Sequence, residues 1–146
     1  VPVSRESGGF GEASRHIVRW KPNIIFLGEI RDADVAAEAL RASINGHLVI
    51  STVHADSVVS AIQRIQSLAS SEAGPEVASL LADGLIATIH QKLETVGSRK
   101  VLKSEFLLMM DENARGARAI IRQGRTEMLV TEIRQQQNLM MNEPRS

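Results

Sequence analysis

The stretch Asn23–Asp32, which reads Asn-Ile-Ile-Phe-Leu-Gly-Glu-Ile-Arg-Asp, runs from four large apolar residues into a glycine and then charged side chains. A short, continuously apolar run of this kind is typical of a strand that is covered on both faces, usually in a parallel sheet. Pro22 stands just before it and ends any preceding helix. The stretch therefore predicts a buried strand over residues 24–29 that finishes in charge.

A second strand and two capped helices are predicted downstream. Residues 48–53 form another apolar run, and Asn45-Gly46 before it is a typical end signal for a helix. Asp32 or Asp34 can cap the helix between the two strands. Asp56 or Ser57 can cap the helix that follows the second strand. Strand, helix, strand, helix is the order of a right-handed crossover unit, so the predicted fold class is α/β, a mostly parallel sheet flanked by helices.

Hydrophobic periodicity predicts the remaining elements. They are an amphipathic helix over residues 10–20, a loop over 70–75, a long helix from Val77 to Leu93, a turn over 96–100, a strand over 101–110, and helices over 114–123 and 126–138. We therefore expect an α/β part over residues 1–110 and a helical subdomain with a tail over residues 111–146.

Composition narrows the class of protein. At 146 residues and 15.9 kDa the chain is one domain at most, and 43% hydrophobic residues are enough for a core. Because 17 basic and 17 acidic residues balance, bulk charge predicts neither nucleic-acid nor membrane binding. The absence of cysteine fits a reducing compartment. Since the chain starts with Val1, in mid-pattern, we expect a fragment of a longer polypeptide.

Two charged side chains follow the predicted strands at the same edge of the sheet. Glu29 ends the first strand and His54 follows the second. In open α/β sheets ligands bind beyond the carboxyl ends of the strands, where a carboxylate and an imidazole can orient water and sense a charged ligand. The alternative is that both are solvated loop residues, and that Asp32 is a helix cap rather than a ligand.

Other kinds of site find less support. The four histidines show no close ligand pair, so the sequence predicts no direct metal site. Four arginines recur at helical spacing near the C-terminus and form one basic face: Arg115, Arg118, Arg122 and Arg125. That face is either solvated or in contact with phosphates or an acidic neighbouring subunit.

Together these motifs resemble the secretion-type traffic ATPases, the family of type II and type IV secretion, type IV pili and conjugation systems. Residues 23–32 are similar to the Walker B box of that family, and residues 46–55, from Gly46 through His54 to Ala55, are similar to its His box. Residues 3–15 resemble the segment that joins the Asp box to Walker B. Residues 91–93 and Glu105 fit the family's strand after the long helix. The resemblance covers nearly the whole chain.

The resemblance implies a role for each matching residue. Glu29 would be the Walker B carboxylate that polarises the attacking water, near Mg²⁺, and His54 would contact the γ-phosphate of ATP. Supporting positions at the nucleotide site would be Gly28, Arg31, Asp32 and His47, and possible subunit contacts would be Arg5, Arg15, Arg115, Arg118 and Arg122.

The resemblance also implies an assembly and a place in the cell. The family fold is a RecA-like P-loop NTPase core with a C-terminal helical subdomain, assembled as a homohexamer. Its partners would be inner-membrane platform or secretion-machine proteins at the cytoplasmic face of the inner membrane. The protein would be peripheral to that membrane and would make no direct contact with nucleic acid.

The sequence departs from the family pattern in three respects. It contains no G-x-x-x-x-G-K-S/T loop, which cradles the phosphates, and the Asp box would precede Val1. We therefore expect these 146 residues alone not to hydrolyse ATP, and a non-catalytic oligomerisation or regulatory module stays as the alternative. Ala119 and Gln123 replace the Asn and Glu of a motif found in pilus-retraction members, which weighs against a retraction role.

Overall fold

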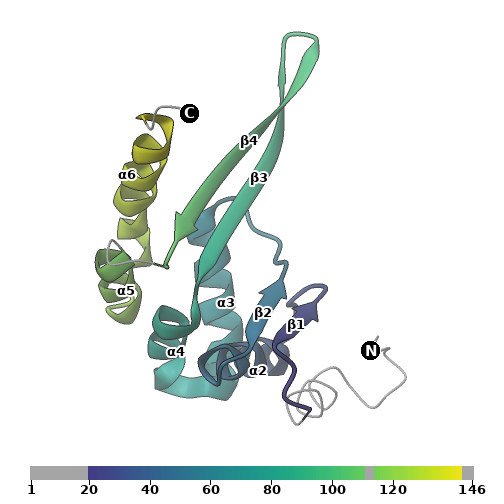
Figure 1. The fold of residues 1–146 in the computed structure, drawn as a ribbon, viewed down its shortest axis with the longest axis vertical. Helices are drawn as coiled ribbons and strands as arrows, with labels where there is room; N and C mark the ends of the chain where they lie inside the picture. Colours follow the sequence, from purple (N-terminus) through teal and green to yellow (C-terminus); the bar gives the residue numbers. More distant parts are fainter. Residues whose placement is uncertain (1–19, 111–113, 143–146) are drawn as a thin grey trace.

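The computed structural model describes residues 20–110 and 114–142 (Figure 1). In chain order the elements are β1 (Ile24–Leu27), α2 (Ala33–Ile44), β2 (Leu48–Ser51), α3 (Val58–Ala73), η1 (Gly74–Glu76), α4 (Val77–Gly84), β3 (Ala87–Val96), β4 (Arg99–Leu108), α5 (Arg115–Arg122), η3 (Thr126–Met128) and α6 (Leu129–Asn142). The helix predicted over residues 10–20 lies outside the described residues.

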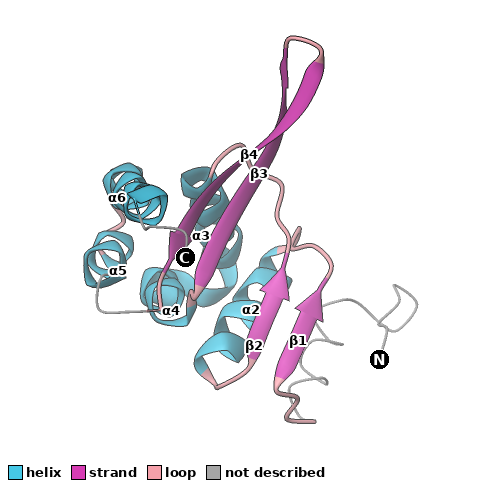
Figure 2. Ribbon diagram, turned by 45° about the horizontal axis from the view of Figure 1, so that its top comes forward, coloured by secondary structure: helices cyan, strands magenta, loops and turns pink. Residues whose placement is uncertain are grey.

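The predicted crossover unit is confirmed. β1 and β2 pair in parallel, with Ile24 opposite Leu48 and Leu27 opposite Ser51. Helix α2 connects them and lies against one face of the pair (Figure 2). It begins after Asp32 and ends at Asn45, and Gly46 then takes a positive φ of 92° that suits glycine.

The expectation that β1 is covered on both faces is wrong for the described part of the chain. Ile25 and Leu27 are buried against α2, whereas Ile24 is 59% and Phe26 is 71% exposed. On an extended strand alternate side chains point to opposite faces, and α2 covers only one of them. An apolar outer face therefore remains on the β1–β2 pair, formed by Ile24, Phe26, Leu48 and Ile50.

Helix α3 begins where the cap predicts. The Ser57 hydroxyl accepts a hydrogen bond from the Ser60 N–H at 3.1 Å, and the Ser60 hydroxyl bonds back to the Ser57 N–H at 2.9 Å. This reciprocal capping box satisfies N–H groups that have no partner within the helix. The loop predicted over residues 70–75 is wrong, because α3 continues to Ala73 and a 3-10 turn follows directly.

The long helix predicted from Val77 to Leu93 is also wrong. Helix α4 ends at Gly84, and Ile89 and Leu93 lie in strand β3, where they are 63% and 65% exposed. A spacing of four residues is compatible with a helix, but it is also an even number and so fits one face of a strand. The periodicity alone could not separate the two.

Strands β3 and β4 form an antiparallel hairpin whose far end projects beyond the helices (Figure 1). A two-residue turn joins them, and Gly97 adopts a φ of 63° there. The described residues thus form one parallel and one antiparallel two-stranded sheet. The α/β class is confirmed, but only half of the described strands are in a parallel sheet.

Helices α5 and α6 pack against α4 and β4, and their buried residues Ile121 and Leu129 belong to the same hydrophobic cluster as Leu107 and Met109. Alongside β4, the Gln136 side chain of α6 forms two hydrogen bonds with the backbone of Leu108. Its Nε2 donates to the carbonyl oxygen at 3.0 Å, and its Oε1 accepts from the N–H at 2.8 Å. This side chain therefore joins the last helix to the hairpin.

Candidate functional site

The ends of β1 and β2 remain joined beyond the last paired residues. The Ile30 N–H donates to the carbonyl oxygen of Thr52 at 3.0 Å. The Thr52 hydroxyl in turn donates to the carbonyl oxygen of Gly28 at 2.5 Å. These two bonds hold the segment after β1 beside the segment after β2, and both segments carry candidate site residues.

The junction brings Glu29 and His54 together, as their positions at the strand ends predict. Nε2 of His54 lies 3.4 Å from Oε1 of Glu29, and the second carboxylate oxygen of Glu29 pairs with the Arg31 guanidinium at 2.6 Å. The His54 side chain is 84% exposed and that of Glu29 is 22% exposed. The imidazole is therefore open to a ligand, while the carboxylate is set back against the sheet.

Arg31 contacts Glu29 within the short segment between β1 and α2. The hydrogen bond from Arg31 holds the pKa of the Glu29 carboxyl below its usual range, against an opposing effect of desolvation. The charges of Arg31, His54 and Arg64 act in the same direction. Conversely, the hydrogen bond to Glu29 raises the pKa of Arg31. Glu29 is thus an ionised, acceptor-only carboxylate near neutral pH.

Two predicted supporting residues take up different places. Asp32 occupies the N-cap position of α2, but its side chain makes no capping hydrogen bond. The Val35 N–H instead donates to Oδ1 of Asp34 at 2.9 Å. His47 lies at the opposite end of the strands, where Nδ1 donates to the carbonyl oxygen of Pro22 at 2.5 Å. Seven residues of extended chain put it roughly 20 Å from His54, so it supports the start of the strands rather than the cluster at their ends.

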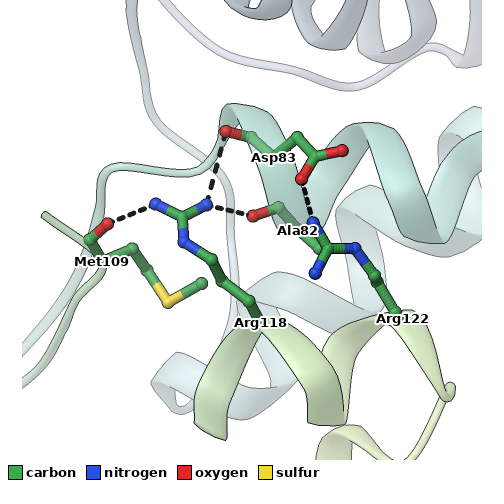
Figure 3. Close-up of polar contacts among 5 residues, drawn as sticks. All are labelled: Ala82, Asp83, Met109, Arg118 and Arg122. Atoms are coloured by element: carbon green, nitrogen blue, oxygen red, sulfur yellow. Dashed lines mark hydrogen bonds and ion pairs between the residues drawn. The ribbon is translucent and has the colours of Figure 1, made fainter. Parts of the chain in front are cut away.

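The predicted arginine face is partly an internal contact (Figure 3). Arg118 donates hydrogen bonds to the carbonyl oxygens of Ala82 and Met109, and Arg122 pairs with the Asp83 carboxylate. Arg118 also approaches the carbonyl oxygen of Asp83 at 3.4 Å. The interpretation as a fully solvated face is therefore wrong at these two positions, because the end of α4 lies directly opposite them.

Arg115 differs from these two arginines. Arg115 is exposed in α5 and forms no ion pair or hydrogen bond with the part of the chain that the structure describes. Arg5 and Arg15 lie outside the described residues. A role in subunit contact stays a prediction for all of them.

Sequence reasoning missed two contributors to the site. Thr52 fixes the two strand ends to one another, and the signal for it was a hydroxyl directly after an apolar strand. Arg64, on the second turn of α3, is near enough for its charge to lower the pKa of Glu29. No local pattern could have indicated this, because 35 positions separate the two residues.

The donor set at the strand ends suits Mg²⁺ held mainly by phosphates. Magnesium prefers oxygen ligands and is usually bound through one or two carboxylates together with substrate phosphates. Glu29 offers such a carboxylate and directly follows Gly28, whose carbonyl oxygen accepts from the Thr52 hydroxyl. Among residues 20–110 and 114–142 no three acidic, histidine or cysteine side chains gather into a metal cage. The residues therefore fit a metal that arrives with a phosphate ligand.

Comparison with known proteins decides the family. The profile of the type II/IV secretion system protein family matches residues 4–144. The chain belongs to this family. Its relatives include the type IV pilus retraction ATPase PilT of Pseudomonas aeruginosa, which is 36% identical over 107 residues covering 73% of this chain. The type II secretion system protein E of Klebsiella pneumoniae is 40% identical over 84 residues, or 58% of the chain.

The fold agrees with a solved member of the family. The crystal structure of the pilus retraction motor PilT with bound ADP superimposes with a TM-score of 0.72 and 30% sequence identity over 88% of this chain. The match covers 37% of that chain, and the curated relatives above are matched over 31% and 16% of their lengths. The 146 residues thus correspond to one part of these secretion-family ATPases. None of the helices in the described part is long and apolar enough to cross a membrane.

Proposed function

We propose that the chain is the Walker B and His-box part of an ATPase that powers a secretion, pilus or conjugation machine. One observation carries the proposal: Glu29 and His54, from two neighbouring parallel strands, lie 3.4 Å apart at the carboxyl ends of those strands. Ligands of open α/β sheets bind at this edge. The ADP-bound relative of the same fold supports a nucleotide as the ligand.

Each side chain has a task that its chemistry permits. The ionised Glu29 accepts a hydrogen bond from the attacking water and orients it, and Arg31 keeps this carboxylate ionised. The exposed imidazole of His54 faces the terminal phosphate. Bound Mg²⁺ supplies charge neutralisation for the phosphates. Gly28 contributes the backbone carbonyl that Thr52 holds, and Asp32 starts the helix behind the site.

We also propose a domain organisation, an assembly and a cellular location for the ATPase. Residues 1–110 would be the C-terminal part of a RecA-like core and residues 111–146 a helical subdomain. The loop that cradles the phosphates would come from sequence outside these 146 residues. Six subunits would form a cytoplasmic ring at the inner face of the inner membrane, in contact with platform or secretion-machine proteins. Arg5, Arg15 and Arg115 would lie at subunit contacts.

A non-catalytic module is the second candidate. It would be a chain of this fold in which no G-x-x-x-x-G-K-S/T motif accompanies the site. Such a module would keep the fold and the subunit contacts but would not turn over ATP.

The deciding experiment uses a longer natural chain that contains these residues and a phosphate-binding loop. Glu29→Gln removes the charge that orients water but keeps the size of the side chain. We expect turnover to fall by about 100-fold or more while the Kd for ATP stays within about threefold. The matched control is Glu76→Gln, an exposed carboxylate in η1 that should leave both quantities unchanged. Unchanged turnover in Glu29→Gln would refute the proposed role.

A further inference from the structure

A carboxylate from the hairpin reaches the first turn of α3. Oε2 of Glu105, in β4, accepts a hydrogen bond from the backbone N–H of Val58 at 2.6 Å. The two residues are 47 positions apart in the sequence. This bond therefore links the β3–β4 hairpin directly to α3, the helix that follows the His-box segment. Glu105 itself is only partly buried, which leaves its second oxygen free for solvent.

Three other N–H groups at this helix start find partners within the first turn. Oγ of Ser60 accepts from the N–H groups of Asp56 and Ser57 at 3.1 and 2.9 Å, and Oγ of Ser57 accepts from that of Ser60. The N–H of Val58 has no such local partner, and Val58 is 0% exposed. In the intact structure this N–H is buried from water, and the Glu105 carboxylate is the acceptor that satisfies it.

This bond matters for the site because of what precedes α3. The loop that carries His54 runs from Thr52 to Ser57. At its first end Thr52 is fixed to β1 through Gly28 and Ile30. At its second end the loop enters the first turn of α3, which Glu105 holds. The exposed His54 side chain has one contact with another described side chain, the carboxylate of Glu29. Its position therefore depends on the two ends of the loop.

We propose that Glu105 is a positioning residue of the nucleotide site, which holds the first turn of α3 so that the His54 imidazole stays beside Glu29. The proposal rests on the proposed ATPase function. A displacement of a catalytic group by about 1 Å can lower a rate by about 100-fold, so a bond far from the chemistry can have a measurable effect on kcat.

The test is a set of substitutions in the longer ATPase chain. Glu105→Ala should lower kcat by at least about tenfold and change KM for ATP by less than about twofold. Glu105→Gln should lie between this variant and the wild type, because a neutral acceptor forms the weaker bond. The matched control is Glu94→Ala, which removes a carboxylate that pairs with Lys103 on the same hairpin and should leave kcat unchanged.

A double-mutant cycle separates positioning from a general structural defect. If Glu105 acts through His54, Glu105→Ala should have no further effect on kcat in a His54→Ala background. Hydrogen exchange provides a second readout: a peptide covering residues 54–60 should exchange faster in Glu105→Ala, while one covering 24–30 should not.

Each outcome decides the matter. Wild-type kcat in Glu105→Ala, or an equal loss in both backgrounds, would overturn the proposal. Should Glu105→Ala fail to assemble, wild-type kcat and wild-type exchange in Glu105→Gln would overturn it instead. The Glu29→Gln variant keeps the two proposals apart. If that variant retains turnover, the ATPase role fails; if it loses turnover and Glu105→Ala does not, only the positioning role fails.

Discussion

The guanidinium of Arg118 donates a hydrogen bond to the carbonyl oxygen of Ala82, in the last turn of α4 (Figure 3). The last four carbonyl groups of a helix have no partner within the helix, and they carry its negative dipole end. A cation at this point satisfies one of these groups and is attracted to all of them. Because Arg118 belongs to α5, this contact fastens α5 to the end of α4.

Arg118→Ala should therefore weaken the fold. The variant loses hydrogen bonds to Ala82 and Met109, and hydrogen bonds of charged groups contribute roughly 1.5–3 kcal/mol each. We expect the free energy of unfolding, measured by urea denaturation, to fall by about 2 kcal/mol. Arg115→Ala is the matched control on the same helix and should change it by less than about 0.5 kcal/mol. Equal losses in both variants would show that the contact contributes nothing specific.

Arg31→Ala should raise the pKa of Glu29. In the folded protein the Arg31 hydrogen bond holds the pKa of Glu29 below its value in the unfolded chain. The ion pair therefore stabilises the fold at pH values above the pKa of the unfolded chain. This stabilisation is lost as the pH falls through the pKa of the folded protein. The chemical shift of the Glu29 carboxyl carbon can be followed by NMR from pH 7 to pH 2. The midpoint of this titration should move up toward the usual glutamate range in the variant. Glu94, which pairs with Lys103, should titrate alike in both proteins. A midpoint of Glu29 that stays the same would exclude Arg31 as the cause.

Gln136→Ala should loosen the last helix. The substitution leaves the N–H and carbonyl of the partly buried Leu108 without partners, at a cost of about 1–3 kcal/mol. Thermal unfolding should show a lower midpoint, and the Leu108 amide should exchange faster with solvent. Gln135→Ala, one position earlier on an exposed site, serves as the control. Identical midpoints for the two variants would contradict the assigned contact.

His54→Ala should separate turnover from assembly. The side chain is 84% exposed, so its removal should change the free energy of unfolding by less than about 0.5 kcal/mol. In the longer chain we expect lower ATP turnover and a smaller change in the fraction of the proposed hexamer, measured by analytical ultracentrifugation. A variant that loses the oligomer but keeps turnover per subunit would assign His54 to a subunit contact instead.

The sequence predicted those parts of the fold that depend on neighbours in the chain. The apolar run of β1 and the serine that starts α3 are local signals, and both elements lie where those signals place them. The strand-end position of Glu29 and His54 followed from the same reasoning, since two parallel strands end at one edge. The helix predicted through Ile89 failed because a spacing of four is shared by helices and strands.

What could not be predicted depends on distant contacts. Nothing near Arg118 in the sequence indicates that its partners are backbone carbonyls of α4 and of Met109, just after β4. A solvated face, or a contact with phosphates or an acidic neighbouring subunit, were therefore the available interpretations. The same holds for Glu105 and Val58, whose bond joins elements that are far apart in the chain. The exposure of Phe26 was also unforeseen, because a continuous apolar run does not reveal how many of its faces are covered.

The glutamines of α6 have a consequence for the topology of the sheet. Strand β4 uses one edge to pair with β3, and along its other edge Gln136 takes up both backbone groups of Leu108 while Gln137 donates to the carbonyl of Ser104 at 3.3 Å. An edge whose peptide groups are already bonded offers no template for another strand. The glutamines of α6 therefore cover this edge of β4 at Leu108 and at the carbonyl of Ser104, where another strand could not pair with those groups.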